Sequence, residues 1–146
     1  MKPLERCSLQ CIYCDDIRAE AQGKTTIVGW HTGEPIGLPA EGALLIPTLG
    51  IVGMLAMPLE SKHESMKVEL LQDQHVLQSV AMPEQALHEM QVDEALTLAP
   101  LFGYQVHQVR IAIKMNNLQV AQPCVLRMRV TVDDEEVYGN GLRFTR

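Results

Sequence analysis

The sequence predicts a mainly β protein, an antiparallel β-sandwich of about seven to nine strands with one short helix. Apolar and polar residues alternate with a period of two in several stretches, which is typical of strands with one buried face. Turn-forming residues separate these stretches, and helical segments do not alternate with them as a doubly wound fold requires. With 146 residues, 47% of them hydrophobic, we expect a single domain spanning residues 1–146.

The alternation is clearest near the C-terminus. In that region the predicted strands are Val109–Met115, Leu126–Val132 and Val137–Phe144. The polar breaks Asn116–Asn117 and Asp133–Glu136 are suited to hairpin turns, because Asn and Asp tolerate left-handed backbone angles. We therefore expect the last two strands to pair.

Further strands are predicted upstream, at Leu9–Cys14, Thr25–Thr32, Met66–Leu70 and Val76–Met82. The first two are joined by a connection from Asp15 to Lys24, and the second two form a hairpin around Gln72–His75. The one helical pattern runs from Pro83 to Leu96, with proline suited to a first turn.

The longest uncharged run extends from Gly42 to Leu59. Pro47 and Gly50 interrupt it and no flanking positive charges anchor it, so we do not expect it to span a membrane. It predicts one or two strands buried on both faces, broken at Pro47–Thr48 or at Gly50. As an alternative, part of it is exposed and forms an interface.

Charge and composition exclude other function classes. The net charge of −6 and the aromatic content of 4% disfavour nucleic acid as a partner. The first residues do not resemble a secretory signal, so we expect a cytoplasmic location and cysteines that are free thiols or metal ligands and not disulfides. Two acidic groups could form a general-base or cation site, but such groups are more often solvated turns. They are Asp15, Asp16 and Glu20 with His31, and the run Asp133–Glu136.

The cysteines Cys7, Cys11 and Cys14 have the CxxxCxxC spacing that resembles radical S-adenosylmethionine enzymes, which hold an iron–sulfur cluster. Thr32–Pro35 is similar to part of that family's Gly-Gly-Glu-Pro motif. If Leu9–Cys14 is a strand, Cys7 and Cys11 lie on one face about 13 Å apart while Cys14 faces the other side. We therefore interpret the spacing as coincidental and expect no cofactor. A zinc site using these thiols with His31 or Cys124 is an alternative.

The segment from Cys14 to Glu20, followed by Gly23-Lys24 and Ile27-Val28-Gly29, resembles the opening of a family of uncharacterised bacterial and phage proteins. The resemblance implies a β-rich module and supplies no catalytic residues. Within the motif, Asp15, Asp16 and Arg18 are the candidate binding residues. They either pin the hairpin through charge-assisted bonds or form a surface that a partner recognises, and we favour the structural role.

These observations favour a non-enzymatic protein-interaction module, encoded by a phage or prophage, that binds a protein partner or associates with itself as a homo-oligomer. The alternatives are a zinc or iron–sulfur protein that uses Cys7, Cys11 and Cys14, and a radical S-adenosylmethionine-like enzyme. The sequence contains no nucleophile elbow, phosphate-binding loop or dinucleotide motif.

Overall fold

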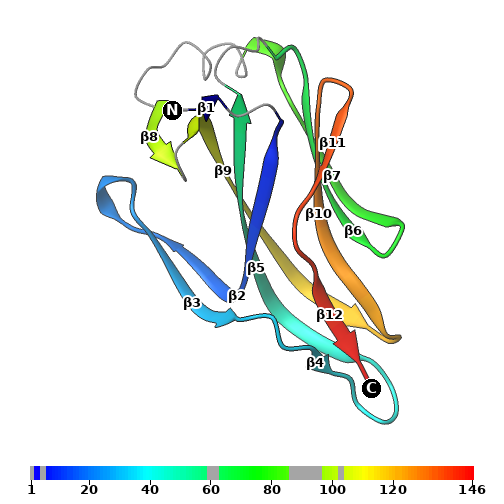
Figure 1. The fold of residues 1–146 in the computed structure, drawn as a ribbon. Helices are drawn as coiled ribbons and strands as arrows, with labels where there is room; N and C mark the ends of the chain where they lie inside the picture. Colours follow the sequence, from blue (N-terminus) through cyan, green and yellow to red (C-terminus); the bar gives the residue numbers. More distant parts are fainter. Residues whose placement is uncertain (1, 4–5, 59–62, 86–96, 102–103) are drawn as a thin grey trace.

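Two β-sheets pack face to face in the computed structural model, which describes residues 2–3, 6–58, 63–85, 97–101 and 104–146 (Figure 1). Sheet A contains β1 (Lys2–Pro3), β2 (Ser8–Ala19), β3 (Thr25–His31), β5 (Leu44–Pro58), β8 (Thr97–Leu101) and β9 (Tyr104–Val120). Sheet B contains β4 (Ile36–Gly37), β6 (Met66–Gln72), β7 (His75–Met82), β10 (Cys124–Val132), β11 (Glu135–Tyr138) and β12 (Leu142–Thr145). The predicted mainly β sandwich is confirmed.

The strand order of sheet A is β1-β9-β5-β2-β3, with β8 also paired to β9, and that of sheet B is β4-β12-β10-β6-β7, with β11 also paired to β10. All pairings are antiparallel except the short contacts of β1 with β9 and of β12 with β4. The described residues contain more strands than we expected, because short strands such as β1 and β4 extend both sheets.

The main core lies between the sheets. Its fully buried side chains include Leu49, Ile51 and Leu55 from β5 and Met128 and Val130 from β10. Aliphatic and methionine side chains dominate this core, as the low aromatic content requires. A second, smaller cluster contains Cys14, Ile17 and Val52.

β5 and β9 are longer than predicted because neither strand turns where the sequence suggested a break. Pro47 lies in β5 opposite Asn117 in β9, and the pairing continues in the same register on both sides of this position. Asn117 has a positive φ of 55°. The residues that face the core are odd-numbered up to Met115 and even-numbered from Leu118, so the ladder kinks here and does not form a hairpin.

Three other boundaries differ from the predictions. β2 continues through Asp15 and Asp16 to Ala19, so the connection to β3 is only the short 3-10 turn Ala21–Gly23 and its flanking residues. The predicted last strand is divided at Gly139–Gly141 into β11 and β12, and both parts pair with β10. Of the predicted helix Pro83–Leu96, Glu84 and Gln85 are helical, and residues 86–96 lie outside the described part.

Candidate functional site

The charged motif of β2 forms ion pairs on the face of sheet A that points away from sheet B. Asp16 Oδ2 lies 3.3 Å from Nε of Arg18, and Asp16 Oδ1 lies 3.0 Å from Nζ of Lys114. The hydrogen bonds from Lys114 and Arg18 hold the pKa of Asp16 below its usual value of 3.8. This network connects β2 to β9, so a structural role accounts for Asp16 and Arg18.

Lys114 reaches Asp16 across a strand that has no side chain at this point. Gly50 of β5 pairs with Cys14 on one side and with Lys114 on the other. A Cβ atom on Gly50 would lie 2.6 Å from Cγ1 of Ile17 and 2.8 Å from Sγ of Cys14. Sequence reasoning missed Lys114, because a lysine at a polar position of an alternating strand carries no signal of its partner.

Asp15 has a different partner from Asp16. Its Oδ1 atom lies 3.1 Å from Nε2 of His31, and its side chain is 66% exposed. Gly29 has a positive φ of 68°, and a Cβ atom there would overlap the Asp15 carboxylate. The Gly of the Ile27-Val28-Gly29 motif is therefore required by local packing. Because Asp16 contacts Arg18 and Lys114 whereas Asp15 contacts His31, the two carboxylates do not form a shared acidic site.

The three N-terminal cysteines are divided between the two faces of sheet A. Cys11 belongs to the main core and Cys7 packs against it, whereas Cys14 belongs to the second cluster. Burial is the main cause that raises the pKa of Cys7 to about 11 and that of Cys11 to about 12. These positions favour neutral thiols and do not bring the sulfurs to one centre.

The residues considered for zinc or calcium have structural partners of their own. Cys124 lies in the core, where its sulfur accepts a hydrogen bond from Nε2 of Gln72. Asp133 accepts hydrogen bonds from the backbone N–H groups of Glu64 and Ser65, at 2.9 and 3.0 Å. Among the described residues, no three His, Cys, Asp or Glu side chains are arranged to hold a metal ion.

The uncharged run Gly42–Leu59 supplies the central strand of sheet A. β5 pairs with β2 along one edge and with β9 along the other, and its residues from Leu49 to Gly53 are buried. Leu45 and Pro47 are exposed, so the alternative that part of this run forms an interface stays a prediction. Because consecutive residues of β5 are buried, the strand is covered on both faces, as the sequence predicted. In the described part of the chain, no helix is long and apolar enough to cross a membrane.

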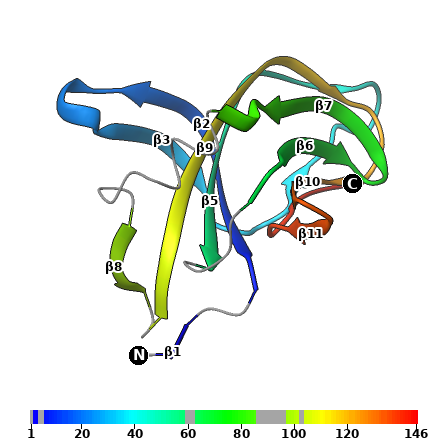
Figure 2. The ribbon, with the colours of Figure 1, turned by 90° about the horizontal axis from the view of Figure 1, so that it is seen from above.

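A groove of about 530 Å³ lies on one side of the sandwich and is lined by β9 of sheet A and by β6 and β7 of sheet B. The ribbon in Figure 2 shows these three strands from above. Its lining is mainly apolar and comprises Met66, Val68, Gln78, Val80, Ala81, Met82, Pro83 and the six consecutive residues from Val109 to Lys114. Val80 pairs with buried Val68 and so faces sheet A, yet it is 51% exposed. Among the described residues, the two sheets are therefore not closed over each other along this side.

The opposite side of the sandwich is closed. There the side chain of Asn140 forms hydrogen bonds with the backbone N–H and C=O of Cys11, which joins sheet B to sheet A. Sequence reasoning missed the open groove, because alternation does not tell which strands lie at an edge. One signal was present: β7 has no Asp, Glu, Lys, Arg or Pro, the residues that usually protect an edge strand.

Comparison with known proteins gives no match. The chain matches no family model, no curated protein and no solved structure.

Proposed function

We propose that this protein is a non-enzymatic protein-interaction module and that the groove between β7 and β9 is its binding surface. The observation that carries the proposal is the open side of the sandwich, where apolar side chains that point between the sheets remain accessible. A contiguous accessible apolar surface on a protein usually marks a contact site.

The edges of the two sheets support the same proposal. β7 is the last strand of sheet B, and β9 pairs with β8 only up to His107, so in the described part of the chain both strands have an unpaired edge at the groove. Unpaired strand edges are common sites for pairing with a second polypeptide. The resemblance of residues 14–29 to bacterial and phage proteins supports a search for the partner among neighbouring genes.

The proposal is tested by site-specific photo-crosslinking in the cell of origin. A benzophenone amino acid is placed at Val80, inside the groove, or at Val76, which is 40% exposed on the same strand and does not line the groove. We expect a discrete covalent adduct from position 80 that is absent from position 76. Equal adducts from both positions, or none from position 80, would contradict a binding role for the groove.

A further inference from the structure

In the part of the chain that the structure describes, no strand covers the edge of β9 along the groove. Residues 109–114 all line it, although their side chains alternate between the two faces of sheet A, which means that the groove runs along the edge of the strand. In an antiparallel pair, every second residue directs its N–H and C=O away from the partner strand. Because β5 occupies the other edge of β9, these groups point into the groove.

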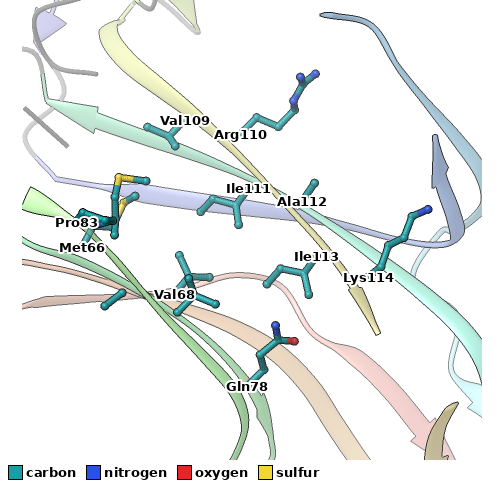
Figure 3. A pocket seen from close by; sticks show the side chains of 13 residues that line it. Met66, Val68, Gln78, Pro83, Val109, Arg110, Ile111, Ala112, Ile113 and Lys114 are labelled. Carbon is teal, nitrogen blue, oxygen red and sulfur yellow. The ribbon is translucent and has the colours of Figure 1, made fainter. Parts of the chain in front are cut away.

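The side chains that flank this edge of β9 determine which residues of an added strand fit in the groove. Figure 3 shows Ile111 and Ile113 pointing towards Val68 on the opposite wall, while Arg110 and Lys114 point to the other side of β9. A strand added beside β9 would place every second side chain between these apolar walls. Six residues at about 3.3 Å each give a strand of roughly 20 Å, long enough for three such side chains.

The outward side chains of an added strand would lie beside Arg110 and Lys114. Lys114 is paired with Asp16, whereas Arg110 has no ion-pair partner among the described residues. Opposite charges on neighbouring strands stabilise a sheet and like charges destabilise it. Acidic side chains at the outward positions therefore complement this edge.

The same charges disfavour a second copy of this chain as the occupant through β9. Two β9 strands that paired antiparallel about Ala112 would place Arg110 of each copy opposite Lys114 of the other. Such like-charge pairs destabilise the contact between two copies.

We infer that the groove binds an extended segment of a partner protein as an additional strand along β9, with apolar residues facing inward and acidic residues facing outward. This inference rests on the proposed function and specifies the chemistry of the partner. Backbone hydrogen bonds to residues 109–114 would provide the affinity, and the apolar walls and Arg110 would select the sequence.

The test uses a defined peptide, Ser-Glu-Val-Glu-Ile-Glu-Val-Ser-amide with fluorescein on its N-terminus, together with the isotope-labelled full chain. We expect binding in a fluorescence-anisotropy titration, with hydrogen-exchange protection of every second amide from residue 109 to 114. A peptide with Lys in place of each Glu should bind more weakly. N-methylation of the peptide amides that face β9 should abolish binding, because it removes the donors of the strand pairing.

Variants of the protein separate the parts of the inference. Arg110→Glu should lower the affinity for the acidic peptide roughly tenfold and raise the affinity for the basic peptide, because a favourable cross-strand charge pair becomes a repulsive one. The matched control Arg143→Glu changes an exposed arginine of β12 away from the groove and should alter neither affinity. Val80→Glu should block both peptides without unfolding the chain, which circular dichroism checks.

The outcomes also separate this inference from the proposed function. A crosslink at Val80 to a second protein, together with no binding of the acidic peptide, would overturn strand addition and leave the interaction module intact. A crosslink between two copies of the chain, together with a dimer in analytical ultracentrifugation that Val80→Glu abolishes, would overturn the inference that the occupant is an acidic segment of another protein. Protection confined to β7 amides would overturn the assignment to β9.

Discussion

The side-chain amide of Asn140 binds the backbone of Cys11 as a neighbouring strand would. Its Oδ1 atom accepts from Cys11 N at 2.7 Å, and its Nδ2 atom donates to Cys11 O at 2.9 Å. β3 pairs with β2 only from Tyr13 onward, so this edge of β2 is otherwise uncovered at Cys11 in the described structure. Asn140 thus bridges the two sheets on the side opposite the groove, and the Tyr13 hydroxyl adds a second bridge by donating to the backbone oxygen of Asn140 at 2.7 Å.

Replacing Asn140 with alanine should reduce the free energy of unfolding by about 1–3 kcal/mol, because the polar backbone groups of Cys11 lose their partner in a partly buried place. Chemical denaturation measures the change. The matched control Gln119→Ala, at an exposed position of β9, should change stability by less than about 0.5 kcal/mol. Equal effects of the two substitutions would show that the amide does not bridge the sheets.

Gly50→Ala should destabilise the chain by about 1–3 kcal/mol, because the added methyl group overlaps Ile17 and Cys14. The control is Gly37→Ala, where an added Cβ meets no atom within 4 Å and the φ angle is not positive. That substitution should leave stability almost unchanged. Thermal unfolding distinguishes the two, and a neutral Gly50→Ala would mean that the second cluster is loosely packed.

The acid response of the Asp16 network has a definite sign. Because Lys114 and Arg18 lower the pKa of Asp16, this carboxylate contributes stability above its usual pKa of 3.8, and the contribution is lost as the pH falls through the lowered value. The stability difference between the native chain and Asp16→Asn should therefore shrink below about pH 4. Urea denaturation across this range tests it, with exposed Asp134→Asn as the control. A difference that stays constant with pH would contradict the network.

Local patterns predicted the elements whose partners are close in sequence. The hairpin of β6 and β7 and the turn at Asp133 follow from alternation and from residues that accept left-handed angles, so they were found. Asn117 also has a left-handed angle, but its effect depends on Pro47, which is distant in the sequence and lies opposite it in the ladder. A local pattern could not distinguish this paired kink from a turn.

In the candidate site, too, local features could be predicted from the sequence and long-range contacts could not. Alternation placed Cys14 on the opposite face from Cys11, since the rule needs only their spacing along one strand. The pairing of Asp16 with Lys114 and the exposure of Val80 depend on the order of strands in each sheet. That order is set by long-range packing, which a single sequence does not display.

The buried thiols predict a loss of stability at high pH. Burial raises the pKa of Cys11 from 9.0 to about 12 and that of Cys7 from 9.0 to about 11, so the folded chain keeps protons that the unfolded chain releases. This contribution is complete below pH 9.0 and should be lost as the pH rises through the raised values. Denaturation between about pH 8 and pH 11 should therefore show falling stability.

Cys11→Ala distinguishes the effect of this thiol on stability from the effects of other groups that titrate at alkaline pH. It should lower stability at neutral pH, since it removes a buried sulfur, but its stability should fall less steeply above pH 9.0 than that of the native chain. Labelling with a thiol-specific disulfide reagent near pH 8 gives a second measurement, because a buried neutral thiol reacts slowly until the chain unfolds. Identical alkaline slopes, or immediate labelling of Cys11 in the native chain, would place this thiol outside the core.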